Sequence, residues 1–412
     1  MKKSSLLFFA LAALGLGSCS NPTVSSSVAS TISSATQSSV TSSTASSVAS
    51  SAVSSSPTSS ISTTITIKDL MDREVTIDKS KVDRVVCIGA GALRLYSYVG
   101  DMSKLVGAED IDRGGTDPFS STIRPYYHAN KNILNALPSC GKGGPKNQAP
   151  EAELIASCRP NIIISEYAKD VSSELQNTLN IPVICLSYGK KQVYDENIIK
   201  SITLLGEIFS KESRAKELVD YIGSISTEIT NITKDIKEED KVTTYVGCIG
   251  NFGVQDIYSS FCNYPIFEVA NVKNVLTTPT FASGYVTVDA EKLQQLNPSK
   301  IIIDAAGLPK FKNTYTENKA IFNNLDAFKN GEIYLQVPYN AYYTNLELAY
   351  VNTYFAAYIN YPSLFGDKFT MANKANEILE KFVGKQIYTD IQNKTYGGYQ
   401  QITNMETFLQ NV

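Results

Sequence analysis

Residues 152–164 read AELIASCRPNIII, and residues 290–303 read AEKLQQLNPSKIII. In both stretches a Glu stands seven residues before a Pro, and a run of three Ile follows. Each stretch predicts a short helix that ends before the Pro, because Pro cannot continue a helix. An Ile run bounded by turn residues is typical of a strand covered on both faces. Since the unit occurs twice, 138 residues apart, we predict two similar α/β lobes.

The neighbouring segments continue this alternation of strands and helices. Strands are predicted at Val82–Ile88, which runs into Gly89-Ala90-Gly91, at Pro182–Leu186 and at Lys241–Ile249. Such alternation favours parallel sheets joined by right-handed crossovers. The expected fold class is therefore α/β, with two Rossmann-like lobes built on parallel sheets.

A long helical pattern lies between the two lobes. Its apolar residues recur every three or four positions, at Ile198, Ile202, Leu205, Phe209, Leu218, Ile222, Ile225, Ile229 and Ile232. Polar residues fill the other positions, which predicts an amphipathic helix that lies against both lobes. The stretch Ser210–Ser213 is a candidate break into two helices. We therefore expect an N-terminal lobe at 64–190, a stiff helical connector at 191–238 and a C-terminal lobe at 239–412.

The first residues of the chain predict export. Lys2 and Lys3 precede an apolar run, Leu6–Leu16, that is too short for an ordinary membrane span. The sequence Leu16-Gly17-Ser18-Cys19 resembles the bacterial lipobox, which implies a lipoprotein signal peptide at 1–19 and a lipid on Cys19. The protein would then be anchored at the extracytoplasmic face of the cell membrane. The alternative is an ordinary signal peptide that happens to contain a Cys.

Residues 20–63 are rich in Ser and Thr and carry almost no charge. Such a stretch buries too little surface to offset its ordering entropy, so it is predicted to be a flexible tether.

Composition excludes several classes of function. The net charge of -3, without a Lys/Arg cluster, argues against a nucleic-acid partner. Six cysteines remain after Cys19 and show no CxxC spacing, so we expect no structural zinc and no dense disulfide framework. His128 is the only histidine, which excludes a metal site made of several imidazoles. With one His and no G-x-S-x-G motif, we expect a binding protein without enzymatic activity.

Several segments together resemble one family. They are Val85–Leu95 (VVCIGAGALRL), the Glu153 helix followed by Arg159-Pro160-Asn161-Ile162, Val286–Glu291 (VTVDAE) and Pro338-Tyr339-Asn340. They are similar to segments of the substrate-binding proteins of ABC importers for siderophores, heme and cobalamin, and the resemblance covers essentially everything after residue 64. It implies two α/β lobes bridged by one long helix, a ligand held between the lobes, and an ABC permease and ATPase as partners.

The resemblance also implies two residues that dock on arginines of the permease. Glu153 and Glu291 stand at the matching position, at the start of each repeated helix. Two carboxylates related by a pseudo-twofold axis would address the two halves of a twofold permease. The competing interpretation is that acidic residues simply favour helix N-termini. Glu151 is an alternative to Glu153.

In open α/β lobes the ligand lies beyond the carboxyl ends of the strands. Gly89-Ala90-Gly91 stands at one such end, but Arg94 occupies the place of the third glycine of a dinucleotide fingerprint, which disfavours that interpretation. Arg94, in the first turn of the next helix, is instead a candidate to contact an anionic ligand. Arg124, Lys142 and Lys146 are further candidates to neutralise such a ligand.

Tyrosine is abundant, at 24 residues, while tryptophan is absent. Its flat apolar face and hydroxyl group suit a large planar or chelated ligand, and a phenolate can bind ferric iron. For any single Tyr, an amphipathic surface residue is the competing interpretation. Seven tyrosines fall on predicted loops: Tyr126, Tyr127, Tyr167, Tyr285, Tyr339, Tyr342 and Tyr343. The candidate ligand-binding set comprises Arg94, Tyr126, Tyr127, Tyr167, Tyr285, Tyr339 and Tyr343, with His128 as a further candidate.

The main hypothesis is a monomeric, lipid-anchored binding protein that captures a metal chelate and delivers it to an importer. A ferric siderophore comes first among the ligands, then heme, then cobalamin. The protein would have no intrinsic cofactor and would hold metal through the bound chelate. The alternative is a surface adhesin or sensory ectodomain that uses the same fold without transport.

Overall fold

The computed structural model describes residues 63–114, 123–144, 149–277 and 284–412. These ranges lie in one compact unit of the chain, residues 60–412. Cys19, Lys146 and nearly all of the expected tether lie outside the described residues.

The N-terminal lobe contains a four-stranded parallel sheet in the order β4-β3-β5-β6. Ile162 and Ile164 pack into one hydrophobic cluster, whereas Ile163 packs into another, because successive side chains of a strand point to opposite faces. The Ile run is thus buried on both faces, as predicted. The elements are β3 Val85–Ile88, α1 Ala92–Val99, β4 Leu105–Ala108, α3 Pro125–Ala136, α4 Ala152–Ser157, β5 Ile162–Ser165, α5 Lys169–Leu179 and β6 Val183–Cys185, preceded by the hairpin β1 Thr64–Lys68 and β2 Glu74–Asp78.

The C-terminal lobe contains a five-stranded sheet in the order β13-β12-β11-β7-β9, in which only the edge strand β13 is antiparallel. Its strands are β7 Thr243–Gly247, β9 Lys273–Asn274, β11 Lys300–Asp304, β12 Ile333–Gln336 and β13 Gln400–Gln401, and a separate antiparallel ribbon joins β8 Ser259–Cys262 to β10 Gly284–Thr287. Its helices are α8 Pro265–Val269, α9 Ala290–Leu296, α10 Leu308–Glu317, α11 Lys319–Phe322, α12 Asp326–Lys329, α13 Leu346–Asn360, α14 Met371–Val383, α15 Tyr388–Lys394 and α16 Met405–Leu409. Short 3₁₀ helices occur along both lobes, at Lys79–Lys81, Met102–Lys104, Asp110–Arg113, Glu238–Asp240, Ala305–Gly307 and Pro362–Leu364.

The repeated unit has the predicted structure in both lobes, since α4 leads into β5 and α9 leads into β11. The side chain of Asp289 accepts a hydrogen bond from the backbone N–H of Lys292 and caps the start of α9. Asn297, in a left-handed conformation, ends this helix directly before Pro298. The prediction of two α/β lobes with parallel sheets is confirmed.

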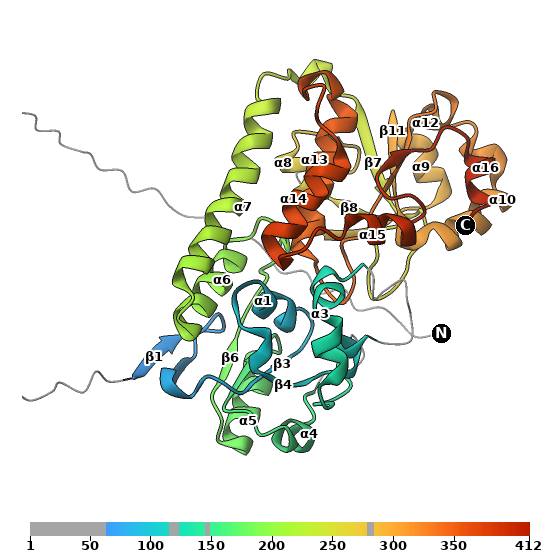
Figure 1. Ribbon diagram of the computed structural model, residues 1–412. Helices are drawn as coiled ribbons and strands as arrows, with labels where there is room; N and C mark the ends of the chain where they lie inside the picture. Colours follow the sequence, from blue (N-terminus) through green and yellow to red (C-terminus); the bar gives the residue numbers. More distant parts are fainter. Residues whose placement is uncertain (1–62, 115–122, 145–148, 278–283) are drawn as a thin grey trace, which may run out of the picture. The chain divides into compact units, whose positions relative to one another are not determined.

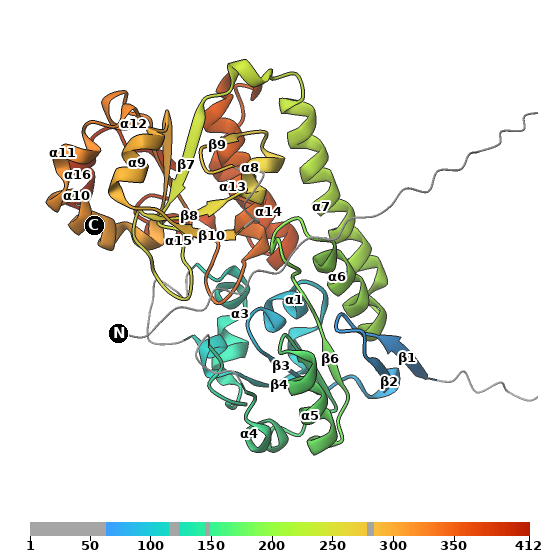
Figure 2. The ribbon, with the colours of Figure 1, turned by 180° about the vertical axis from the view of Figure 1, so that it is seen from behind.

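The connector consists of two helices, α6 Glu196–Phe209 and α7 Glu212–Thr233. They break at Ser210, which has a φ of 54° and whose backbone N–H bonds to the carbonyl of Gly206. The predicted break is therefore confirmed. α6 packs against α1 in the N-terminal lobe, and α7 packs against α8 and α13 in the C-terminal lobe, as Figures 1 and 2 show.

Two segments that the sequence predicts as loops are regular structure, so the loop predictions for Tyr126, Tyr127 and Tyr285 are wrong. Pro125 begins α3, because a Pro has the φ of a helix and the first helical residue needs no N–H partner. Tyr285 lies in β10 directly opposite Phe261, and the two ring centroids are 4.8 Å apart. Cross-strand aromatic contact stabilises this short ribbon.

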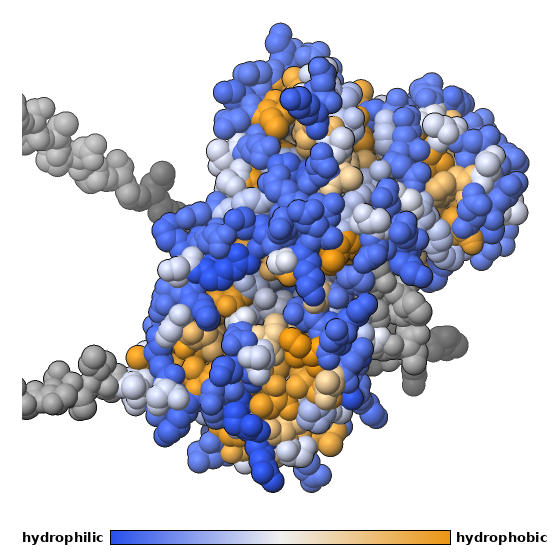
Figure 3. All heavy atoms as spheres, viewed as in Figure 1, coloured by the Kyte–Doolittle hydropathy of each residue, from blue (hydrophilic) through white to orange (hydrophobic). Residues whose placement is uncertain are grey.

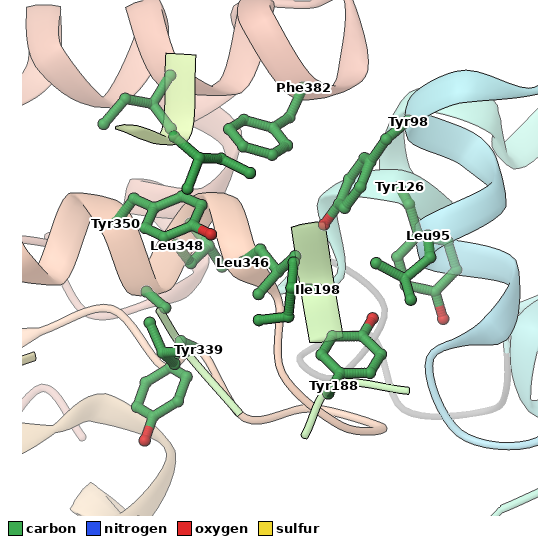
Figure 4. Packing of buried hydrophobic residues seen from close by; sticks show 14 of the residues in the cluster. Leu95, Tyr98, Tyr126, Tyr188, Ile198, Tyr339, Leu346, Leu348, Tyr350 and Phe382 are labelled. Carbon is green, nitrogen blue, oxygen red and sulfur yellow. The ribbon is translucent and has the colours of Figure 1, made fainter. Parts of the chain in front are cut away.

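One hydrophobic cluster includes residues of both lobes and of the connector. Figure 4 shows Phe382 of α14 between Tyr98 of α1 and Tyr350 of α13. The ring of Phe382 lies 5.0 Å from that of Tyr98 and 5.6 Å from that of Tyr350, measured between centroids. Because well-packed interiors deform little, this shared cluster resists large movement of one lobe against the other.

The surface seen in Figure 3 is mostly hydrophilic, and its apolar residues gather chiefly on the lower part of the view, over the N-terminal lobe. In the ranges that the structure describes, no helix combines the length and the apolar character needed to cross a bilayer.

Candidate functional site

The carboxyl ends of the parallel strands of both lobes carry polar residues. In the N-terminal lobe Gly89 follows β3, Glu109 follows β4 and Tyr188 follows β6 by a few residues. In the C-terminal lobe Asp304 ends β11, and a segment that we call the cleft loop, residues 339–345, follows β12. Side chains from the two sets of ends touch one another, so the lobes share one polar site.

Arg94 of α1 joins the two lobes at this site. Its guanidinium is fully buried and donates to Oδ1 of Asn345 at 3.0 Å and to the carbonyl oxygens of Ala341 and Tyr342 at 2.9 Å each. It also lies over the ring of Tyr126, 4.8 Å from the centroid. The predicted anion-binding residue is thus at the lobe boundary, but in this structure it holds the cleft loop.

Tyr342 makes the second polar contact between the lobes. Its hydroxyl donates to Oε2 of Glu109 at 2.6 Å and accepts a hydrogen bond from the backbone N–H of Gly144 at 3.3 Å. The same carboxylate oxygen accepts from the backbone N–H of Gly89 at 3.1 Å. Burial, together with the nearby Asp112, raises the pKa of Glu109 to about 7.

Three more carboxyl groups near the boundary have raised pKa values. Burial raises the pKa of Glu166 to about 8 and that of Asp304 to about 7. Burial also raises the pKa of Glu347, which accepts a hydrogen bond from the hydroxyl of Tyr98. A protonated carboxyl can donate as well as accept a hydrogen bond. Near neutral pH, Glu109, Glu166 and Asp304 can therefore act as donors as well as acceptors of hydrogen bonds.

The predicted tyrosines separate into two groups. Tyr126 and Tyr127 are buried inside the N-terminal lobe, where their hydroxyls bond Asp112 and Asn135, and Tyr339 is also buried. Tyr167, Tyr285 and Tyr343 are half-buried at the boundary of the lobes. The hydroxyl of Tyr167 lies 3.5 Å from Glu109, that of Tyr285 accepts from Asn340 at 2.6 Å, and the ring of Tyr343 meets Tyr188 edge-on at 4.7 Å.

Of the other candidates, Arg124 and Lys142 lie close to this polar site, whereas His128 contacts Asp390 of the other lobe. His128 is 2.9 Å from Asp390 through its Nε2 and lines a surface pocket of about 280 Å³ with Lys385. Arg124 is buried beside Asp112, at 3.8 Å, and Lys142 is exposed. Within the described ranges no three His, Cys, Asp or Glu residues are grouped so that they could hold a metal ion.

Glu153 and Glu291 occupy equivalent places in the two lobes. Each is exposed and lies in the first turn of its helix, α4 or α9. Glu151 differs, because its Oε1 accepts the backbone N–H of Lys142 at 2.7 Å. Of the two acidic residues at the start of α4, Glu153 is therefore the one whose carboxylate is more open to a partner.

The sequence did not identify Glu109 or the role of Tyr342. β4 has the sequence LVGA, which is short and carries a Gly, so it gives no clear strand signal. A polar residue directly after an apolar run, as Glu109 is after Leu105–Ala108, was the one available sign.

The raised carboxyl pKa values predict how stability depends on pH. Glu109, Glu166 and Asp304 bind protons more tightly in the folded chain than in the unfolded chain. Between about pH 5 and 8 the folded state thus holds more protons, and the free energy of unfolding falls as pH rises. We expect urea unfolding to show greater stability at about pH 5.5 than at about pH 8.5. The Glu109→Gln variant should show a smaller difference; an unchanged difference contradicts the assignment to Glu109.

Comparison with known proteins adds the following. A model of the periplasmic binding protein family matches residues 96–338. The high-affinity heme uptake system protein IsdE of Staphylococcus aureus (strain Newman) is 26% identical over 195 residues, which are 45% of this chain and 62% of that protein. The match thus spans less than two thirds of that relative's length.

Two solved structures resemble the model. A periplasmic solute binding protein from Veillonella parvula has a TM-score of 0.62 at 17% identity and covers 81% of this chain and 96% of its own. The molybdate periplasmic binding protein MolA of Haemophilus influenzae, bound to molybdate, has a TM-score of 0.59 at 18% identity, with coverage of 78% and 98%. At these identities the likeness shows the fold.

Proposed function

This chain belongs to the periplasmic binding protein family, and from that premise we propose that it is the extracytoplasmic substrate-binding protein of an ABC importer. In this proposal it captures a metal chelate between its lobes and acts by binding, without catalysis. The meeting of strand-end loops from both lobes at Arg94, Glu109 and Tyr342 carries the proposal. A ligand that touches both sets of loops would favour one lobe arrangement, and a permease can recognise such a state.

The ligand in this proposal is a metal chelate. The name of the Staphylococcus aureus relative supports heme as the first candidate. A ferric siderophore is the second candidate and cobalamin the third. Tyr167, Tyr285 and Tyr343 are half-buried and offer aromatic faces to a large ligand. Arg94 would bind carboxylate or chelate oxygens once it releases the cleft loop. The metal would be held by the chelate.

Release of the cleft loop is the step that would admit the ligand. Tyr342 and Tyr343 have φ values of 49° and 71°, which side-chain-bearing residues rarely adopt. The contacts of Arg94 and Glu109 stabilise this conformation. The cleft loop therefore competes with the ligand for Arg94 and Glu109.

The proposal includes the membrane anchor and the docking residues. A lipid on Cys19 and a tether at 20–63 would hold the lobes near the permease, and Glu153 and Glu291 would contact it. Family membership favours this transport role over an adhesin or a sensory ectodomain.

Titration of the purified protein with hemin, a ferric hydroxamate and cobalamin tests the proposed ligand class. Tyrosine fluorescence reports binding, because the chain has 24 Tyr and no Trp. We expect saturable quenching by at least one chelate, with a visible absorption change for hemin. Binding of none of the three, with tight binding of a sugar or a peptide, contradicts the proposal.

Tyr342→Phe is expected to tighten chelate binding about fivefold, because it removes roughly 1 kcal/mol from a contact that the ligand must displace. The matched control is Tyr315→Phe, which removes a hydroxyl that bonds Asn323 in the C-terminal lobe, away from the cleft loop. Its affinity should equal that of the unmodified protein. Weaker binding by Tyr342→Phe would contradict the competition and make the Tyr342 hydroxyl a contact of the ligand.

A further inference from the structure

Two buried cysteines meet on one face of the N-terminal sheet. Cys140 and Cys158 belong to the same hydrophobic cluster as Val86 and Ile163, and both side chains are buried. All six cysteines of the described residues are free thiols. Cys87 points to the opposite face, since it packs in the cluster of Val85.

The two cysteines face each other across Gly107 of β4. A Cβ built on Gly107 would lie 3.2 Å from the Cβ of Cys140, 3.2 Å from the Cβ of Cys158 and 2.6 Å from the Sγ of Cys158. The two cysteine Cβ atoms therefore lie within twice 3.2 Å of each other. The Sγ of Cys158 is also 3.7 Å from the carbonyl oxygen of Ser139, the residue before Cys140.

This arrangement is close to what a disulfide needs. A disulfide places its Cβ atoms about 3.5–4.5 Å apart. Both cysteine Cβ atoms lie 3.2 Å from one point above Gly107, which puts no atom between them, so a backbone displacement of no more than about 2 Å at Cys140 or Cys158 satisfies that distance. Any larger residue at position 107 would separate the cysteines.

We propose that Cys140 and Cys158 form a disulfide in the mature protein. The inference rests on the extracytoplasmic location in the proposed function, because oxidising compartments support disulfides. A disulfide-bearing oxidant, small-molecule or protein, supplies the chemistry. The thiolate of Cys158 attacks one sulfur of the oxidant and releases a thiol; the thiolate of Cys140 then attacks Sγ of Cys158 and releases the second thiol. The two cysteines lose two protons and two electrons, which reduce the oxidant.

The bond forms while the lobe folds. Burial raises the pKa of the Cys158 thiol and of the Cys140 thiol, so the reactive thiolates are scarce once folding is complete. Because both cysteines are buried, the finished disulfide is shielded from external thiols.

A disulfide here would fix the docking helix to the sheet. The backbone N–H of Cys140 bonds the carbonyl of Ala108, at the end of β4, at 3.0 Å. Cys158 is the C-cap of α4, the helix that carries Glu153. The bridge would therefore hold the proposed docking residue in register with β4, the strand that places Glu109.

Differential alkylation of the full chain tests the inference. Protein taken from the cell envelope without reductant is denatured and treated with one alkylating agent. It is then reduced and treated with a second agent, and its peptides are analysed by mass spectrometry. We expect the second label on Cys140 and Cys158 and the first on Cys87, Cys185, Cys248 and Cys262. The first label on all six, or a bridge between any other two, overturns the inference.

Thermal unfolding gives an independent readout. Protein that has been unfolded, reduced and refolded in reductant is expected to have a Tm about 4 °C lower than the oxidised protein, the effect of opening a ring of this size in a domain of this length. The same drop should persist in Cys262→Ala and disappear in the Cys140→Ala, Cys158→Ala double variant. No drop in the unmodified protein overturns the inference.

Refolding separates this inference from the proposed function. The chain, refolded in an oxidising glutathione buffer, is expected to form the Cys140–Cys158 bridge; failure to form it overturns the inference wherever the protein resides. If the bridge forms on refolding but is missing from protein taken from cells, the inference is overturned because its premise, the extracytoplasmic location, is wrong. Chelate titration of the oxidised and reduced protein reports on the proposed function separately.

Discussion

Replacement of Arg94 by Ala is expected to loosen the contact between the lobes of the ligand-free protein and to lower the free energy of unfolding by about 3 kcal/mol. The fully buried guanidinium donates to oxygens of Asn345, Ala341 and Tyr342. Without it, these oxygens lose a charged donor at a site with little access to water, which is costly. The buried carboxyl of Glu347 would also lose the positive charge that lowers its pKa.

Urea unfolding and solution X-ray scattering measure the two parts of this prediction. Arg94→Lys keeps the charge but lacks the planar fork that reaches two carbonyls, so it should lie between Arg94→Ala and the unmodified protein. Arg84→Ala is the matched control, because exposed Arg84 also donates to two backbone carbonyls, of Arg159 and Cys158, but within one lobe. Its radius of gyration should not change. An unchanged radius of gyration and stability in Arg94→Ala would rule out the role of Arg94 as a link between the lobes.

Joint replacement of Glu153 and Glu291 by Ala is expected to reduce uptake about tenfold or more while chelate affinity stays the same. Both carboxylates are exposed at the first turns of matching helices, so their removal should affect an encounter with arginines of a permease. Stability should change little, because exposed surface substitutions rarely do more. Uptake of labelled chelate by cells and titration of the purified variant measure the two quantities.

The control for the docking residues is Glu174→Ala with Glu317→Ala, which removes two exposed carboxylates from α5 and α10. This pair should leave uptake unchanged. If the Glu153, Glu291 variant also transports normally, docking through these residues is refuted. If deletion of the whole protein leaves growth under iron limitation unaffected, the adhesin or sensory alternative gains support.

Sequence patterns predict those features of the fold that depend on interactions between residues close together in the chain. A Glu, a Pro seven residues later and an Ile run specify helix, stop and buried strand within fourteen residues, so both units appear as predicted. The left-handed Ser210 broke the connector where the polar stretch indicated. Pro125 gives no local sign of α3, because a Pro that starts a helix and a Pro that sits in a loop look alike in sequence.

The burial of the tyrosine side chains could not be predicted from their neighbours in the sequence. Tyr127 and Tyr343 are both flanked by another Tyr and a polar neighbour, yet Tyr127 is buried inside one lobe and Tyr343 lies at the boundary between two. Their exposure depends on which elements pack over them, and no neighbour in sequence encodes that.

By itself, then, the sequence determined two α/β lobes, a broken helical connector and a resemblance to importer binding proteins, because helix stops, buried runs and apolar periodicity act over a few residues. Only the tertiary structure decided that Arg94 holds residues 341, 342 and 345, that Tyr342 reaches Glu109, and that Cys140 and Cys158 share the space above Gly107. In the first two cases the partners are more than two hundred residues apart, and their contact exists only because the connector and the shared hydrophobic cluster bring two strand-end surfaces together.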